Sequence, residues 1–157
     1  MTTMRRANPR EQGEIGLSIA ISWFGRSGYA VLVPLCDNQP YDLIVDDGER
    51  LARVEVKTTT RRTRGGVFYV DLRTTGGNRS VYTSRLFDPA KADLLFVVTD
   101  AGDANLLPTT ALTTTSNLTL GPRVQSFRVG GPVAADGAAP YHPVPRWDAR
   151  EAKGKRL

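Results

Sequence analysis

The sequence predicts a mixed α/β domain built on one central β-sheet that is flanked by helices. Three observations lead to this fold class. An apolar segment of helical length comes first, β-branched runs of strand length follow it, and a strong hairpin dipeptide separates two of these runs. The chain has 157 residues, which is enough for one such domain and leaves little room for a second.

The helix is expected over residues 9–26. Asn8 is a favourable N-cap residue, Pro9 suits the first helical position, and Glu11 suits the first turn. Gly25 and Gly28 mark the end of the segment. We expect residues 1–8 to be a flexible basic N-terminus and the helix to open the domain.

Strands are predicted by runs of β-branched and aromatic residues between turn signals. The first, over 29–35, is expected to be buried, and a second follows over 41–45. Asp47-Gly48 is a typical two-residue hairpin turn, so 51–60 is predicted as the return strand.

The remaining elements are less regular. We expect a basic turn over 61–66, a strand over 67–73, a loop over 74–78, a short helix within 79–91, a central strand over 94–99, a short edge strand at 106–107 and a strand over 124–129. Residues 9–129 are therefore expected to form the domain. Residues 130–157 are expected to form an irregular basic arm rich in Gly, Ala and Pro.

The composition excludes several classes of protein. The chain is 40% hydrophobic and 24% charged, which is ordinary globular usage, and no apolar run approaches the roughly 20 residues needed to span a bilayer. A lone cysteine, Cys36, cannot form an internal disulfide, and a lone histidine, His142, cannot supply a zinc site. We therefore expect a cytoplasmic protein with no membrane partner.

The charge is positive and unevenly distributed. The formal net charge is +5, and the stretch from Arg50 to Ser80 holds eight basic residues against two acidic ones. This pattern favours a polyanionic partner, although a solvated basic surface would give the same count.

Two acidic residues and a lysine are predicted to meet on one face of the hairpin. A two-residue turn at Asp47-Gly48 would place Asp42 opposite Arg53, and strand alternation would put Glu55 and Lys57 on the same face. Carboxylates this close repel one another unless a cation lies between them, and oxygen ligands favour a hard ion such as magnesium. The alternative is a set of ordinary cross-strand charges on an exposed face.

Glu14 is a further acidic candidate because it lies in the preceding helix between Gly13 and Gly16. Small neighbours would let the helix approach the sheet closely. A role in helix-dipole stabilisation is the alternative interpretation.

Four segments together resemble the PD-(D/E)xK nuclease superfamily, most closely the group I intron-associated endonucleases and next the archaeal Holliday-junction resolvases. The segments, in chain order, are Gln12-Gly13-Glu14, Gly28-Tyr29-Ala30-Val31, Tyr41-Asp42-Leu43-Ile44 and Val54-Glu55-Val56-Lys57-Thr58. The resemblance covers residues 9–112 and implies a restriction-endonuclease-like mixed sheet. Tyr41 departs from it, since it replaces the proline that names the motif, and so does Glu55, where intron-associated members can carry Gln.

The resemblance also implies roles for these residues. Asp42 and Glu55 would ligate magnesium (or manganese as a substitute) together with the Val56 carbonyl, and Lys57 would position or activate the attacking water. Glu14 would be an additional acid, acting directly or through water. The set of four side chains is complete, which argues for an active enzyme.

The sequence leaves the function open between three alternatives. The first is a magnesium-dependent DNA endonuclease that cuts duplexes, the second is a Holliday-junction resolvase, and the third is a non-catalytic DNA-binding module. Five arginines are candidates for contacts to the phosphate backbone: Arg61, Arg62 and Arg64, with Arg5 and Arg6 as weaker ones. One active site cuts one strand, so a homodimer or a higher even oligomer is expected.

Overall fold

The computed structural model describes residues 7–36, 38–76 and 83–130. Two of the arginines predicted to bind DNA, Arg5 and Arg6, lie outside the described residues, as do His142 and all of the predicted arm over 130–157 except Gly130. The predicted boundaries of the N-terminal segment and of the arm therefore stay predictions.

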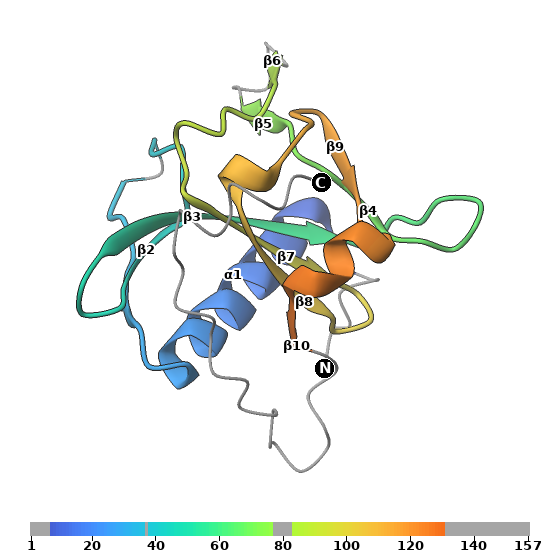
Figure 1. Ribbon diagram of the computed structural model, residues 1–157. Coiled ribbons are helices and arrows are strands. Elements are labelled where there is room, and N and C mark those ends of the chain that lie inside the picture. The colour runs from blue at the N-terminus through green and yellow to red at the C-terminus, as the bar shows by residue number, and fades with distance from the viewer. Residues whose placement is uncertain (1–6, 37, 77–82, 131–157) are drawn as a thin grey trace.

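A mixed sheet forms the centre of the described chain (Figure 1). Its strands lie side by side in the order β1 (Ala30–Leu32), β2 (Leu43–Asp46), β3 (Leu51–Thr59), β7 (Leu94–Thr99), β8 (Ala104–Pro108) and β10 (Arg128–Gly130). β3 and β7 run parallel, and every other neighbouring pair is antiparallel. The predicted fold class is confirmed.

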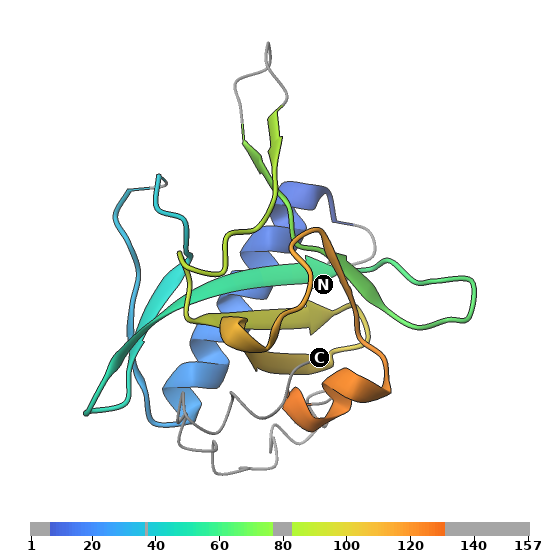
Figure 2. The same ribbon diagram turned by 45° about the horizontal axis from the view of Figure 1, so that its top comes forward.

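Helix α1 (Pro9–Arg26) covers one face of this sheet (Figure 2). Asn8 caps it as predicted: its side chain accepts from the Glu11 N–H, and the Glu11 carboxylate accepts from the Asn8 N–H. The apolar side of α1 packs on the sheet through Ala20 and Phe24, which are fully buried against strand residues such as Phe96.

Gly16 sets how closely α1 approaches β3. A Cβ atom at this position would lie 2.0 Å from the Thr58 Cγ2 atom, so only glycine fits without a shift. At Gly13 a Cβ atom would meet nothing within 4 Å. The predicted close approach is therefore confirmed for Gly16 and is wrong for Gly13.

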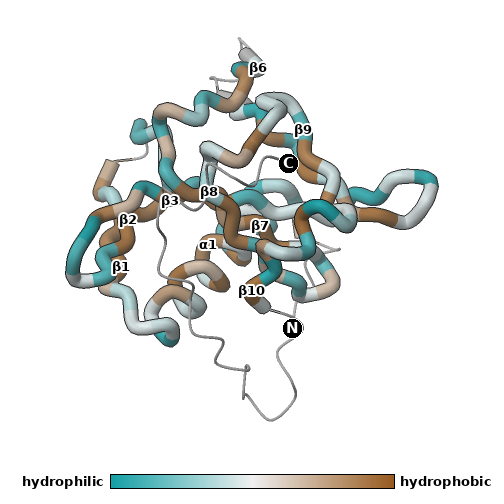
Figure 3. The backbone as a smooth tube through the Cα atoms, in the orientation of Figure 1, coloured by the Kyte–Doolittle hydropathy of each residue, from teal (hydrophilic) through white to brown (hydrophobic). Residues whose placement is uncertain are grey.

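The opposite face of the sheet carries a second apolar core. It is covered by a small sheet of β4 (Tyr69–Asp71) and β9 (Asn117–Thr119) and by the 3₁₀ helices η2 (Thr109–Ala111) and η3 (Pro122–Phe127). β7 is buried along its whole length because it lies between the two cores. In Figure 3 much of β7 and β8 is brown, the colour of hydrophobic residues.

A two-stranded ribbon projects from the body of the molecule (Figure 2). β5 (Thr74–Gly76) pairs with β6 (Thr83–Arg85) in antiparallel register. The predicted loop over 74–78 is wrong where it covers β5. The short helix expected within 79–91 is also wrong over 83–91, because this segment forms β6 and a loop that contains a turn at 89–90.

Three predicted strands differ from the structure. Residues 29–35 give only the short β1, which is an edge strand with Leu32 and Val33 about half exposed, because only β2 pairs with it. β8 is not an edge strand, since β10 pairs beyond it. Residues 124–129 are mostly 3₁₀ helix, which Pro122 starts, and only the end enters the sheet as β10.

Within the described ranges, no helix has both the length and the apolar character needed to cross a membrane.

Candidate active site

The hairpin of β2 and β3 sets the geometry of the candidate site. Asp46 pairs with Leu51, so the loop between them has four residues, and the predicted two-residue turn is wrong. The carboxylate of Asp47 accepts from the N–H groups of Glu49 and Arg50, which stabilises the longer loop. Gly48 adopts the left-handed conformation within it, with φ of 89°.

The longer loop shifts the register by two residues and improves the alignment of the acidic residues. Leu43 pairs with Val54, so Asp42 falls opposite Glu55, just beyond the end of the ladder. Because the register shifts by an even number of residues, Asp42 still lies on the same face of the sheet as Glu55, as predicted. Val54 belongs to the core beneath α1, so Asp42 and Glu55 lie on the other face of the sheet.

Asp42 is held in place by the backbone of β3. Its Oδ2 atom accepts from the Val56 N–H at 2.7 Å, and its own N–H donates to the Val54 carbonyl at 2.9 Å. β2 starts only at Leu43, so the Asp42 side chain takes the place of a strand partner for Val56. The carboxylate is thereby fixed beside β3.

Glu55 and Lys57 stand next to each other on the same face of β3. The Lys57 Nζ atom lies 2.8 Å from the Glu55 Oε1 atom, with the lysine side chain 17% and the glutamate side chain 10% exposed. Both charges are therefore largely removed from water. The structure brings Asp42, Glu55 and Lys57 together, as the sequence predicts.

Burial raises the pKa of both carboxyl groups. For Asp42, desolvation outweighs the Val56 hydrogen bond and the Lys57 charge, which lower the pKa. For Glu55, desolvation again dominates, Lys57 lowers the pKa, and the Asp42 charge raises it further. One ammonium group thus faces two carboxylates. Keeping both carboxylates ionised therefore costs free energy in the folded protein.

The donor atoms that remain suit a hard divalent cation. Among the described residues, no hydrogen bond or ion pair reaches Asp42 Oδ1 or Glu55 Oε2. The Val56 carbonyl leaves β3 on the same side as the Val56 N–H, beside Asp42 and just beyond the start of β2. Carboxylate and carbonyl oxygens are the ligands that magnesium accepts, with waters completing its shell. Within the described residues, however, no group of three or more His, Cys, Asp or Glu side chains is arranged to hold a metal. Among the described residues, Asp42 and Glu55 are therefore the candidate side-chain ligands of such a cation.

Glu14 lies apart from this cluster. It is on α1, which covers the other face of the sheet, and its side chain is 66% exposed. Among the described residues its carboxylate contacts Arg10, at 3.2 Å. The structure therefore supports no direct contact between Glu14 and the Asp42 carboxylate.

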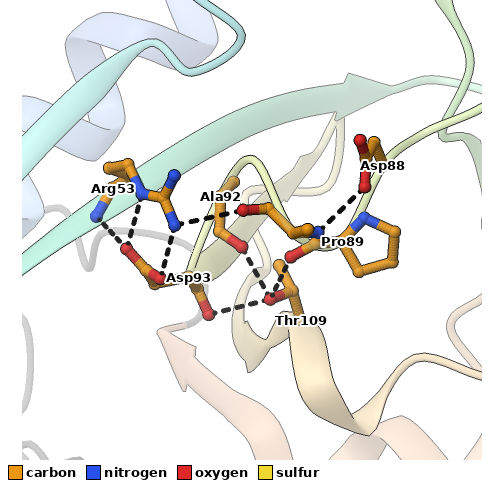
Figure 4. Close-up of polar contacts among 7 residues, drawn as sticks. Arg53, Asp88, Pro89, Ala92, Asp93 and Thr109 are labelled. Carbon is orange, nitrogen blue, oxygen red and sulfur yellow. Dashed lines mark hydrogen bonds and ion pairs between the residues drawn. The ribbon is translucent and has the colours of Figure 1, made fainter.

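A second charged cluster, the Arg53–Asp93 cluster, lies two residues before Glu55 on the same face of β3 (Figure 4). Arg53 donates to both Asp93 carboxylate oxygens through its side chain, at 3.0 Å each, and to Oδ2 through its backbone N–H at 2.8 Å. Thr109 anchors the far side of the same segment, since its hydroxyl lies 2.7 Å from the Ala92 carbonyl. Sequence reasoning gave these residues no role, because 40 positions separate Arg53 from Asp93.

The three predicted arginines within the described residues lie on the loop between β3 and β4. Arg61, Arg62 and Arg64 are all exposed, and the loop projects beyond the end of β3 (Figure 1). Arg62 has partners within the chain: its guanidinium lies 3.1 Å from Asp100 and 3.8 Å from the centre of the Phe68 ring. Sequence reasoning missed two further exposed arginines, Arg73 and Arg85, at the base of the ribbon.

The sequence model of the PD-(D/E)XK endonuclease family matches residues 7–126. This range includes α1, the hairpin of β2 and β3, and the residues Asp42, Glu55 and Lys57. No curated protein matches the chain.

Two solved structures are similar to it. The bacterial homing endonuclease I-Ssp6803I superposes with a TM-score of 0.68 at 24% identity, over 78% of this chain and 89% of that one. Hjc, a Holliday junction resolvase from the archaeal hyperthermophile Archaeoglobus fulgidus, gives a TM-score of 0.48 at 11% identity, over 75% of this chain and 90% of that one. The first likeness supports the fold.

Proposed function

The chain belongs to the PD-(D/E)XK endonuclease family, and on this premise we propose that it is a magnesium-dependent DNA endonuclease that hydrolyses phosphodiester bonds in duplex DNA. One observation carries the proposal: two largely buried carboxylates share a sheet face with one lysine, and each keeps an oxygen atom that no other described residue contacts. Such a cluster is unfavourable for folding and favourable for binding a divalent cation.

Each residue of the cluster has a part in this reaction. Asp42, Glu55 and the Val56 carbonyl would hold the ion, which when bound supplies charge neutralisation at the scissile phosphate and lowers the pKa of water. Lys57 is the nearest cation and would orient the attacking water or neutralise a phosphate oxygen. Glu14 would act only through water, because its side chain is exposed and paired with Arg10.

DNA is the proposed partner, and exposed arginines are the proposed contacts. Arg61 and Arg64 lie just beyond the strand that carries Glu55 and Lys57, and Arg73 and Arg85 lie at the base of the ribbon. Contacts to phosphates of this kind make binding depend steeply on salt and little on base sequence.

The test is a cleavage assay with linear, supercoiled and four-way-junction DNA, with magnesium or with a chelator. Wild type should cut in magnesium and lose cutting in the chelator. Asp42→Asn should abolish cleavage but keep DNA binding near wild type, since it removes a negative charge that repels phosphate. Asp46→Asn is the matched control: Asp46 lies four residues along the hairpin and caps the Gly48 N–H, so cleavage should persist.

The outcomes separate the alternatives. Cutting that survives the chelator would contradict the metal site. Binding without cutting in magnesium and in manganese would indicate a non-catalytic DNA-binding module. Preferential cutting of the four-way junction would replace the duplex endonuclease with a resolvase.

We further propose that the active form is a homodimer or a higher even oligomer, because each cluster can cut one strand at a time. Light scattering of the protein as it elutes from a size-exclusion column should give a mass of two or more chains. A monomer that only nicks supercoiled DNA would contradict this part of the proposal.

A further inference from the structure

The β3–β4 loop, residues 61–68, is an ordered hairpin and not a loose basic segment. The Tyr69 N–H donates to the Arg61 carbonyl at 3.1 Å, and the Thr63 N–H donates to the Val67 carbonyl at 2.8 Å. Between these bonds Arg62 and Phe68 form a β-bridge, and Gly66 turns the tip with φ of 80°. Both ribbon views show this loop extending away from the body of the molecule (Figures 1 and 2).

The three arginines of this loop differ in what their side chains contact. Among the described residues, no ion pair or side-chain hydrogen bond engages the guanidinium of Arg61 or Arg64. Arg62 instead contacts Asp100 and stacks over Phe68. The same local sequence therefore supplies two exposed cations and one cation engaged within the protein.

Asp100 explains why Arg62 is held. It follows β7 directly, its N–H donates to the Thr59 carbonyl at 3.1 Å, and its side chain is only 3% exposed. A carboxylate removed from water to this degree needs a cation close by, and the Arg62 guanidinium provides one. The ion pair therefore joins the base of the loop to the end of the central strand.

We propose that Arg62 is a positioning residue, which fixes the β3–β4 loop through Asp100 and Phe68 so that Arg61 and Arg64 meet the DNA phosphates, and that it does not itself contact DNA. This inference rests on the proposed function. It revises the sequence-based expectation that all three arginines bind phosphate alike.

The test measures how DNA affinity depends on salt for variants of the loop and of its anchor. Arg64→Ala should reduce the slope of log affinity against log salt by about 0.9, the effect of one lost phosphate contact. Arg62→Lys should weaken binding about tenfold, although it keeps the charge, because an ammonium group lacks the planar stacking and fork geometry. Arg128→Lys is the matched control, since Arg128 is as exposed as Arg62 and also pairs with an aspartate, Asp103, but lies on β10 at the edge of the sheet.

Asp100→Asn gives the sharpest discrimination. If Arg62 contacted phosphate directly, the variant would free a cation and remove a negative charge, and binding would tighten. A positioning role predicts weaker binding, matching that of Arg62→Lys, and no further loss in the double variant. Phe68→Leu serves as the second variant if Asp100→Asn does not fold, and it too should weaken binding.

Limited digestion with trypsin measures how firmly the same loop is held when no DNA is present. Asp100→Asn should speed cleavage after Arg61 and Arg64, whereas Asp71→Asn should leave the digestion rate unchanged. Tighter DNA binding by Asp100→Asn, or wild-type affinity in Arg62→Lys, would overturn the positioning role. Wild-type protein with no salt-dependent DNA binding would instead overturn the proposed function.

Discussion

Two charged clusters on one face of β3 use similar residues, but the carboxylate charge is balanced within the protein in one cluster and not in the other. The Arg53–Asp93 cluster joins one carboxylate to one guanidinium. The second, which we call the acidic cluster, joins Asp42 and Glu55 to Lys57. Arg53, Glu55 and Lys57 alternate along the same strand, so they differ in their partners and not in their secondary structure.

The Arg53–Asp93 cluster is saturated. Asp93 accepts from the Arg53 side chain and backbone, and this hydrogen bonding lowers its pKa below the ordinary value. Arg53 also reaches the Ala90 carbonyl at 3.2 Å. The cluster fastens the segment before β7 to β3 and leaves no carboxylate oxygen unused (Figure 4).

The acidic cluster is not saturated. Desolvation raises the pKa of Asp42 and of Glu55, and a single lysine faces both. The comparison shows that proximity of charges does not by itself identify a functional site. The distinguishing feature is whether the carboxylates are compensated within the protein, and four predictions test this difference.

The largest expected effect is on cleavage by Lys57→Ala. Removing a group that orients or activates the nucleophile should lower the rate about 10²–10⁴-fold. Lys91→Ala is the control, because Lys91 also pairs with a carboxylate, that of Asp88, but is 59% exposed and lies outside the cluster. Equal rates for Lys57→Ala and wild type would remove Lys57 from the reaction.

The second effect is stabilisation by a divalent cation. Magnesium at 100 times its dissociation constant should raise the free energy of unfolding by about 2.7 kcal/mol, measured by thermal melting. Asp42→Asn should lose this gain, and Asp93→Asn should keep it, since Asp93 is already compensated. A gain that survives in Asp42→Asn would place the cation elsewhere.

The third effect is destabilisation by Asp93→Ala. The loss of hydrogen bonds to a charged partner should lower the free energy of unfolding by about 1–2 kcal/mol, reduced by the partial exposure of both side chains. Urea denaturation at several pH values measures this. Because the folded pKa of Asp93 is lowered, the stabilisation is present above the unfolded value of 3.8 and is lost as the pH falls through the folded pKa. The gap between variant and wild type should therefore shrink in acid.

The smallest effect has the opposite sign. Asp42→Asn should increase the stability of the metal-free protein at neutral pH by about 1 kcal/mol or less, since Asn can still accept from Val56 and carries no charge. The folded pKa of Asp42 is raised. The contribution of Asp42 to the stability of the wild type is therefore present in full below the unfolded pKa of 3.8 and is lost as the pH rises through the folded pKa. The advantage of Asp42→Asn should thus grow with pH. If Asp42→Asn were less stable than wild type at pH 8, this would contradict the conclusion that the charge of the buried Asp42 carboxylate is not compensated within the protein.

Much of the fold could be predicted because its signals are local. Asn8, Pro9 and Glu11 define the start of α1 through contacts within three residues, and the apolar run at Leu94 predicts a strand buried on both faces. The turn at Asp47 was harder to predict. Its type depends on hydrogen bonds within the loop, and the loop length decides the register of β2 and β3.

The sequence by itself determined that Asp42, Glu55 and Lys57 share one face of the sheet, because strand alternation and an even register shift both preserve the face. Only the tertiary structure decided which charges are compensated. Arg53 with Asp93 and Arg62 with Asp100 are separated by about 40 residues, and no local pattern relates them. The physical reason is that desolvation and charge pairing depend on packing between distant segments, whereas helix caps and strand alternation depend on near neighbours.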